Sequence, residues 1–199
     1  MDLWLLSLIA FIAGYLPGSI PFGLLIGKWA GLGDIRKQGS GNIGATNMLR
    51  IGGKKLATIT LLADILKGAL PVAIMQTIWG FEMALITAFA TVIGHMFPIW
   101  LKFKGGKGVA TSIGAFIGLS SALGFIVIIC WLLTAKLSKI SSLSALVATG
   151  MAPIFSLIIF GGESSLYILA ITVMVWIRHH ENIKRLLKRE EPKIGNSKG

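Results

Sequence analysis

The sequence predicts an all-α integral membrane protein, and its composition and the spacing of its apolar runs are the observations behind this prediction. The 199 residues are 54% hydrophobic and 14% charged, with a mean hydropathy of +0.80. Such values are typical of a chain that crosses a membrane several times. The single cysteine, Cys130, lies inside an apolar run, which excludes an intrachain disulfide or a cysteine metal cluster.

Seven transmembrane helices are predicted in chain order, near residues 3–27, 56–79, 81–101, 109–119, 122–135, 142–160 and 164–178. A helix needs ~20 apolar residues to span the hydrocarbon region, and most of these runs approach that length. The first run follows Asp2 and has no positively charged leader, so we interpret it as a retained span and not as a signal peptide. Residues 1–188 would form one polytopic membrane domain, followed by a basic cytoplasmic tail at 189–199.

The distribution of basic residues predicts how the helices are oriented. The net charge is +11, and all lysines and arginines except Lys67 lie in the segments 28–55, 102–107, 136–139 and 178–198. The opposite ends of the apolar runs hold only acidic residues, namely Asp2, Glu82 and Glu163. The positive-inside rule therefore places the basic segments and the C-terminus in the cytoplasm and the N-terminus outside.

The run at 109–135 must then cross the membrane an even number of times, because the basic segments on both sides of it are cytoplasmic. Turn-forming residues at 118–124 divide it into two short helices. The alternative is one tilted span over 109–135, which would leave Lys136 and Lys139 outside. Seven helices follow from the first interpretation.

A glycine-rich stretch between two apolar runs predicts a phosphate-binding turn. It holds three glycines and two lysines within five positions: Lys104, Gly105, Gly106, Lys107 and Gly108. Glycines let backbone amides approach an anion closely, lysines add positive charge, and a helix beginning near Val109 would add the positive end of its dipole. Gly108 stands where a Walker A loop has Ser or Thr, so the stretch is not such a loop. An ordinary basic turn at the membrane surface is the alternative.

A second polar constellation lies between Gly39 and Arg50. Its small residues include Ser40, Asn42 and Thr46, which offer hydrogen bonds from a backbone able to fold tightly. Arg50 offers a bidentate fork for phosphate or carboxylate. An ordinary polar loop with internal side-chain-to-backbone bonds is the alternative.

Asp64, Lys67 and His95 are ionisable residues within predicted helices. Asp64 and Lys67 are three residues apart on one helical face, so we expect them to pair and to face the bundle interior, either bracing the site or acting in it. His95 lies toward the cytoplasmic end of its helix and is interpreted as a packing or hydrogen-bonding histidine.

Further polar residues follow the last two predicted cytoplasmic turns. His179 and Asn182 share one helical face, so both can point into the mouth of the bundle. One serine in the stretch at 141–144 is expected to cap the sixth helix, and Ser142 is also a candidate ligand contact. The His-His-Glu run at 179–181 has no second ligand cluster, so no metal site is predicted.

Nearly all of this polarity lies on one side of the membrane, which favours an enzyme over a transporter. A transporter needs polar groups through the midplane, and only Asp64 and Lys67 approach it. The pattern is typical of an enzyme that acts at the cytoplasmic interface on a lipidic partner and a soluble anion. A small anion or phosphate carrier is the alternative, and a non-catalytic scaffold is a weaker one. The excess of basic residues is explained by their position on the cytoplasmic face of the membrane, and not by binding of nucleic acid.

The chain resembles the bacterial acyl-phosphate-dependent glycerol-3-phosphate acyltransferases, the PlsY family, in three ordered motifs at residues 39–50, 103–111 and 179–187. The similarity runs through nearly the whole chain and includes the segments 64–68, 94–98 and 191–193. Arg189 and Glu190 depart from the family, which often has Gly-Thr before the glutamate that Glu191 matches.

The resemblance implies a seven-helix enzyme that transfers a fatty acyl group from acyl phosphate to the 1-hydroxyl of sn-glycerol 3-phosphate, giving lysophosphatidic acid and phosphate. It implies the bacterial inner membrane as location and an active site that faces the cytoplasm, with no cofactor and no obligate protein partner. The chain also lacks the His-x4-Asp pair of thioester-dependent acyltransferases, which favours acyl phosphate as the donor.

By motif, the resemblance carries an essential serine and arginine onto Ser40 and Arg50, and a functional histidine and asparagine onto His179 and Asn182. It implies that phosphate is bound beside Lys104 by the glycines of the turn. Two further positions match a site serine and a structural glutamate, Ser142 and Glu191. The general base stays open between His179 and a substrate phosphate, as do the acyl-chain preference, the oligomeric state and the identity of the phosphate in the turn.

Overall fold

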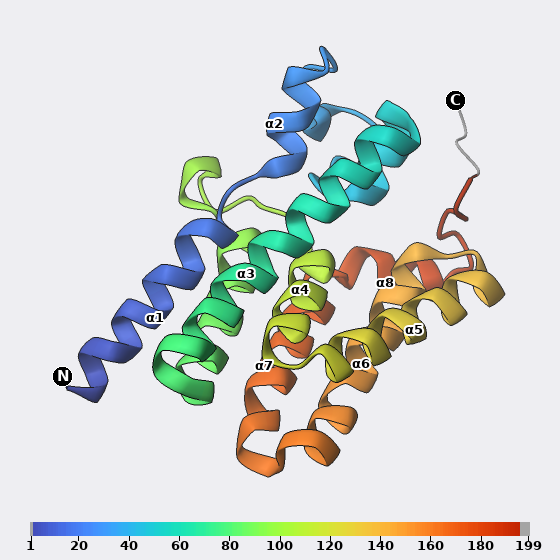
Figure 1. Cartoon of the computed structure of the whole chain (residues 1–199). Coiled ribbons are helices and arrows are strands. Elements are labelled where there is room, and N and C mark those ends of the chain that lie inside the picture. Colours follow the sequence, from blue (N-terminus) through green and yellow to red (C-terminus); the bar gives the residue numbers. More distant parts are fainter. Residues whose placement is uncertain (1, 196–199) are drawn as a thin grey trace.

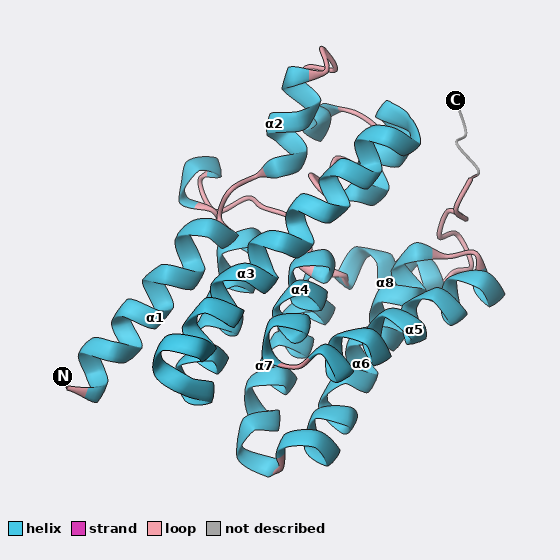
Figure 2. Ribbon diagram, in the orientation of Figure 1, coloured by secondary structure: helices cyan, strands magenta, loops and turns pink. Residues whose placement is uncertain are grey.

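The computed structural model describes residues 2–195, and this part of the chain contains helices and turns but no strand (Figure 1, Figure 2). Two short 3-10 turns, η1 (Ile35–Lys37) and η2 (Ile99–Leu101), lie between helices. The helices are α1 (Leu3–Gly18), α2 (Phe22–Trp29), α3 (Ala45–Met96), α4 (Val109–Leu119), α5 (Ser121–Ser138), α6 (Ser141–Phe160), α7 (Gly162–Arg178) and α8 (His180–Leu187).

Helical stretches long and apolar enough to cross a membrane make up much of the described chain. Four qualify by length and composition, and α4 is a shorter apolar helix. The four are Leu3–Trp29, Ala45–Leu101, Ser121–Ser138 and Ser141–Phe160. Large apolar side chains point outward along them, as Trp4 and Ile158 illustrate, which is the arrangement expected when lipid replaces water.

The first predicted helix, 3–27, is wrong as a single element because the chain breaks between α1 and α2. Pro21 has no N–H to donate and disfavours helical geometry at Ile20. The carbonyl of Ile20 instead accepts a hydrogen bond from Lys67 Nζ at 2.7 Å. The chain then turns into α2, where Gly23 lies so close to the carbonyl of Ile43 that a side chain would not fit.

Helix α3 contains two of the predicted spans, joined by a glycine at which the helix folds back. Gly53 (φ 76°) and Gly80 (φ 82°) have positive φ, which glycine adopts without steric cost, and they divide α3 into limbs at 45–52, 54–79 and 81–96. The predicted helix at 81–101 ends early, at Met96, because Pro98 disfavours helical geometry at the residue before it.

The predicted pair of helices within 109–135 is confirmed, and the alternative of one tilted helix is wrong. Helix α4 spans Val109–Leu119 as predicted, and α5 follows after Ser120, which is extended at φ −161° and ψ 123°. The Ser120 hydroxyl accepts a hydrogen bond from the N–H of Leu123 at 3.5 Å. The chain therefore reverses at Ser120, and α5 runs back toward the α8 end of the bundle while it diverges from α4 (Figure 1).

One apolar core joins α3 to α7, and α1 packs against the returning limb of α3. Phe116, Leu123 and Ile168 are fully buried in this core. Helix α1 approaches closely because Gly14 and Gly18 meet the carbonyls of residues 87 and 91 with no side chain between. The turns at Gly80, Ser120 and Gly161 lie at one end of the bundle, and α8 lies at the other (Figure 1).

The segment predicted as a basic tail is partly folded. After α8 the chain turns back, and the N–H of Ile194 donates a hydrogen bond to the carbonyl of Lys139 at 2.6 Å. Glu191 and Pro192 consequently lie over the start of α6 and not in free solution. The last four residues of the predicted tail, 196–199, are outside the described residues.

Candidate active site

A cavity of about 750 Å³ lies at the α8 end of the bundle. Because α3 folds back at Gly80, both Arg50 near its start and His95 near its end line this cavity. The loop before α3, the second limb of α3, the starts of α4 and α6, the middle of α5, the region where α7 meets α8, and residues 191–192 complete the lining. The helical hairpins thus bring together polar residues from 39 to 191 that the sequence placed on one membrane face.

The polar half of the cavity has an excess of positive charge. Its acidic residues are already paired: Asp64 with Lys67 at 2.7 Å, and Glu191 with Arg185 at 2.6 Å. Glu181, at the rim, is paired with Lys184. Within residues 2–195, no carboxylate forms a salt bridge with the remaining cations, Arg50, Lys107 and Arg178. Three cations without an acidic partner make this half of the cavity a site for an anion of high charge.

A chain of hydrogen bonds links the glycine-rich turn to the segment after α8. Lys107 Nζ donates to Asn182 Oδ1, and Asn182 Nδ2 donates to Glu191 Oε1 at 2.6 Å. Ser142 Oγ donates to the same carboxylate oxygen at 2.7 Å, and Arg185 Nε donates to Oε2 at 2.6 Å. Burial opposes ionisation of Glu191, but these donors outweigh it and lower its pKa. Burial lowers the pKa of Lys107 to about 8.

His179 is held as a neutral imidazole with a defined tautomer. Its side chain is buried, and Nδ1 lies 2.8 Å from the carbonyl oxygen of Val175. A carbonyl only accepts, so Nδ1 carries the proton and Nε2 has a free lone pair. Burial lowers the pKa of His179 to about 4, so the ring is uncharged at neutral pH.

The loop before α3 is fixed by a residue that sequence reasoning missed. Asn47 is fully buried, and its Oδ1 accepts from both the N–H and the Oγ of Ser40, at 2.7 and 3.1 Å. Its Nδ2 donates to the carbonyls of Ile35 and Gln38. Ser40 lines the cavity because Asn47 holds it there. An asparagine just inside a helix that follows a glycine-rich loop is the signal that could have identified it.

Further predicted polar residues lie just before and within the start of α3 and at the start of α6. Thr46 Oγ1 and Ser141 Oγ lie 3.1 Å apart, and both residues line the cavity with Asn42. The expected serine N-cap of α6 is wrong, since Ile140 occupies that position with no side-chain cap. The hydroxyl of Ser144 instead donates back to the carbonyl of Ile140.

The glycine-rich turn differs from the expected ring of free amides. The N–H of Gly105 donates to the Met96 carbonyl and that of Gly106 to the His95 carbonyl, each at 3.1 Å, so neither amide is available to an anion. Lys104 is exposed and does not line the cavity. Lys107 and Gly108 do line it, so the turn presents its second half to the site.

The predicted ion pair of Asp64 and Lys67 is confirmed, with both side chains 2% exposed. His95 is buried beside it, with Nδ1 3.8 Å from Asp64 Oδ1 and without a hydrogen-bond partner among the described residues. Its ring packs against Gly106, at which an added Cβ would overlap Nε2. The packing interpretation of His95 therefore holds, and the hydrogen-bonding one does not.

The other half of the cavity is apolar and reaches the lipid-facing surface. Ile65 and Ile113 lie at its inner side, while Leu61 and Leu132 are about half exposed at its outer side. Trp131 of α5 also lines this half. The cavity therefore has two adjoining environments: a polar one that suits the head group of a lipid-like molecule, and an apolar one that suits its chain.

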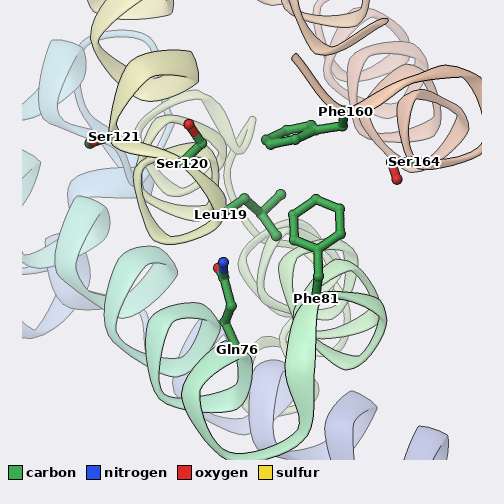
Figure 3. Close-up of a pocket in the computed structure, with 7 residues that line it drawn as sticks. All are labelled: Gln76, Phe81, Leu119, Ser120, Ser121, Phe160 and Ser164. Atoms are coloured by element: carbon green, nitrogen blue, oxygen red, sulfur yellow. The ribbon is translucent and has the colours of Figure 1, made fainter.

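A second hollow, of about 480 Å³, lies at the opposite end of the bundle and has no charged residue in its lining (Figure 3). Figure 3 shows Phe81 and Phe160 facing it from two different helices, with ring centroids 4.8 Å apart. Gln76 and the serines at the α4–α5 and α6–α7 turns supply its polar groups. Without a cation, this hollow is not suited to bind phosphate.

The fold and site together define a class: a helical integral membrane protein with a cationic cavity that continues into a lipid-facing apolar groove. The family model for glycerol-3-phosphate acyltransferase matches residues 8–189. This chain belongs to the glycerol-3-phosphate acyltransferase family.

Relatives and solved structures agree with this assignment. A glycerol-3-phosphate acyltransferase of Sinorhizobium medicae is 49% identical over 189 residues, which cover 95% of this chain and 93% of the relative. A glycerol-3-phosphate acyltransferase of Agrobacterium fabrum is 48% identical over 191 residues, which cover 96% of this chain and 93% of the relative. The crystal structure of PlsY, an integral membrane glycerol 3-phosphate acyltransferase, in its glycerol 3-phosphate form has a TM-score of 0.90 at 36% identity and covers 95% and 96% of the two chains. The lysophosphatidic acid form has a TM-score of 0.88 at the same identity, with 95% of each chain covered.

Proposed function

We propose that this protein transfers a fatty acyl group from acyl phosphate to the 1-hydroxyl of sn-glycerol 3-phosphate, which gives lysophosphatidic acid and inorganic phosphate. Family membership supports the acceptor and the class of reaction. The observation that carries the proposal is the set of cations without acidic partners, Arg50, Lys107 and Arg178, at the head of an apolar groove.

Charge and shape support two phosphate substrates in one site. The acceptor and the donor each bring a phosphate, and the cavity has cations to offset both. The fatty chain of the donor would lie among Ile65, Ile113 and Trp131, while its head group would lie near Lys107. The absence of a His-x4-Asp pair also favours acyl phosphate over a thioester as the donor.

The proposed step is a single displacement. The glycerol oxygen bonds to the acyl carbon, the bond between that carbon and the phosphate oxygen breaks, and the hydroxyl proton ends on phosphate. Acyl phosphate is already activated, so orientation and neutralisation of the developing charge on phosphate supply the acceleration, and no covalent enzyme intermediate is needed.

The pKa of His179 bears on which group takes the proton. At about 4 it is roughly two units below the second pKa of a phosphate group, which is ~6. A substrate phosphate is therefore the stronger base, and the free Nε2 of His179 is suited to accept a hydrogen bond from the glycerol hydroxyl and orient it. This favours the substrate phosphate as the final proton acceptor.

We further propose seven membrane crossings, with the N-terminus outside, the C-terminus in the cytoplasm and the cavity open to the cytoplasm of a bacterial inner membrane. Two limbs of α3 together with α1, α4, α5, α6 and α7 would supply the crossings. The basic residues at the cavity end support this orientation through the positive-inside rule. The cytoplasm is also where a soluble phosphate ester would reach the site.

The test uses the purified full chain in liposomes or lipid cubic phase with palmitoyl phosphate and glycerol 3-phosphate. We expect release of phosphate and formation of lysophosphatidic acid, and no product when palmitoyl-CoA replaces palmitoyl phosphate. Arg50→Ala should lower the rate at least a hundredfold, while Arg36→Ala, at an exposed ion pair outside the cavity, should not. Absence of product together with uptake of labelled glycerol 3-phosphate would refute the enzyme and favour a carrier.

A further inference from the structure

The glycine-rich turn is held from two opposite sides. On one side the carbonyls of His95 and Met96, at the end of α3, accept from the N–H groups of Gly106 and Gly105. On the other side Arg178, the last residue of α7, donates from Nη2 to the carbonyl of Gly105 at 2.8 Å and from Nε to the carbonyl of Gly106 at 3.1 Å. Both hydrogen-bonding groups of each glycine are therefore engaged.

Arg178 is itself held in place by its surroundings. Its guanidinium lies 5.6 Å from the ring centroid of Phe97, a cation–π distance, and its side chain is only partly exposed. Within residues 2–195 it forms no salt bridge, so both described partners of its fork are the glycine carbonyls. Its chain neighbour is His179, a cavity residue.

The direction of these bonds matters for an anion site. Carbonyl oxygens that faced the cavity would repel a phosphate, and the fork of Arg178 holds two of them. Lys107 and Gly108 follow at once and do line the cavity, where α4 begins. The fork thus sets which way the backbone leaves Gly106 and where Lys107 enters the site.

We propose that Arg178 is a positioning residue that orients the glycine-rich turn so that Lys107 and the start of α4 meet the substrate phosphate. The proposal rests on the proposed acyl transfer for its kinetic consequence, but the geometry of the turn can be measured without it. A lysine cannot replace the arginine, because one ammonium group on a flexible stem does not reproduce two parallel donors.

The experiment compares Arg178→Lys with Arg36→Lys in the full-length protein in lipid. Arg36 forms an equivalent two-donor fork, to Asp34, on the exposed surface, so the control makes the same chemical change outside the cavity. Two readouts are taken: the KM and kcat for glycerol 3-phosphate with palmitoyl phosphate as donor, and hydrogen exchange of the amides in the 103–108 segment.

For Arg178→Lys we expect at least tenfold faster amide exchange in this segment and a KM raised about tenfold, with kcat changed less than threefold. Arg36→Lys should match the wild type in both. Unchanged exchange in Arg178→Lys would overturn the proposal even with a raised KM, because direct contact of Arg178 with a phosphate would raise the KM without loosening the turn. A loss of folded protein with normal KM would also overturn it. If the wild type makes no product but exchange is faster in Arg178→Lys, the proposed acyltransferase activity is refuted. The proposal that Arg178 orients the glycine-rich turn then still stands.

Discussion

At the scale of single residues, the glycines of the turn are required chiefly for space. An added Cβ at Gly105 would overlap the carbonyl of His95, and one at Gly106 would overlap the imidazole of the same residue. Only Gly108, at φ 85°, adopts the left-handed conformation that favours glycine. The backbone freedom expected from the sequence is thus used at one position, and the other two allow close packing.

Gly106→Ala tests this explanation. The new methyl group must displace His95, which we expect to cost about 1–3 kcal/mol of stability, as overpacking does, and to shift Lys107. The KM for a phosphate substrate should therefore rise more than the yield of folded protein falls, as measured by kinetics and thermal unfolding. Gly162→Ala is the control, since nothing lies within 4 Å of its added Cβ. A normal KM with impaired folding would mean that Gly106 is purely structural.

The lowered pKa of Lys107 leads us to expect that activity falls at alkaline pH. Burial lowers its pKa to about 8, so the free enzyme loses this positive charge as the pH rises through about 8. The substrate phosphates are already dianionic above ~6, and His179 is neutral above about 4. We therefore expect kcat/KM for glycerol 3-phosphate to fall above pH 8, up to tenfold per unit. In Lys107→Arg, which stays charged, this fall should be absent; an identical alkaline limb in both proteins would contradict the assignment.

Sequence reasoning found most of the cavity residues but not how each one acts. Ser40, Arg50, Ser142, His179, Asn182 and Glu191 all line the cavity. These residues could be identified because they are polar residues in an apolar chain. Composition could not show which of the two lysines of the turn, Lys104 or Lys107, lines the cavity. The turn geometry separates them, because the bonds to His95 and Met96 leave Lys104 exposed. Arg178 was counted as a flanking charge, since nothing local reveals a partner 72 residues away.

At the scale of elements, a buried lysine compensates for the break between α1 and α2. Lys67 Nζ reaches both the carbonyl of Ile20, which also accepts from the N–H of Phe22 at 3.0 Å, and the carboxylate of Asp64, each at 2.7 Å. A carbonyl oxygen has two lone pairs, and at membrane depth, where no water is at hand, a second donor from a side chain satisfies the one that the turn leaves open. Lys67 therefore links the break to the second limb of α3, and Asp64 balances its charge.

Lys67→Met should be strongly destabilising. It leaves Asp64 buried without a counter-charge and removes one of the two donors to the carbonyl of Ile20. Removing one partner of a buried pair costs about 3–5 kcal/mol. Thermal unfolding in detergent would show a lower midpoint. The double variant Asp64→Asn/Lys67→Met should recover part of the loss, because no charge is then left unpaired. A single variant as stable as the wild type would show that the pair is dispensable.

Helix positions were predictable where apolar runs were bounded by turn residues, and less so where proline or glycine acts within a run. The limits of α4 follow directly from its flanks, and α6 ends at Phe160 as predicted. The break before Pro21 was missed because hydropathy continues across it, and because the contacts that follow it, such as that of Gly23 with Ile43, cannot be seen in the sequence. Helix α8 was likewise hidden in a basic stretch whose apolar residues are too few for a span.

At the scale of the whole molecule, the cationic cavity and the uncharged hollow occupy opposite ends of the bundle. This polarity matches the charge distribution from which the orientation was predicted. The number of reversals, not the hydropathy of any one helix, decides which end each loop reaches. The separation of α4 from α5 is therefore the feature on which the predicted orientation depends most.

Reporter fusions test that orientation. A reporter joined after Ser121 should be active outside the cytoplasm and one joined after Lys139 active inside, because α5 lies between them. A fusion after Gly161 should behave like the first. If the Ser121 and Lys139 fusions report the same side, α5 does not cross the membrane and the seven-crossing topology is wrong.

The overall architecture was predictable because membrane-spanning chains obey few rules, namely length, hydropathy and the side of the positive charges. The meeting of residues 40, 107, 142, 179 and 191 was not predictable from these rules. It depends on α3 folding back at Gly80 and on the chain after α8 returning to α6, as the bond from Ile194 to Lys139 records.

The brevity of α4 has a consequence for its place in the bundle. Its 11 residues extend only about 16 Å, roughly half of the ~30 Å hydrocarbon thickness. None of these residues is exposed, so neighbouring helices and not lipid cover the helix. A helix too short to cross the hydrocarbon region alone can therefore lie at membrane depth, because protein surrounds its backbone there.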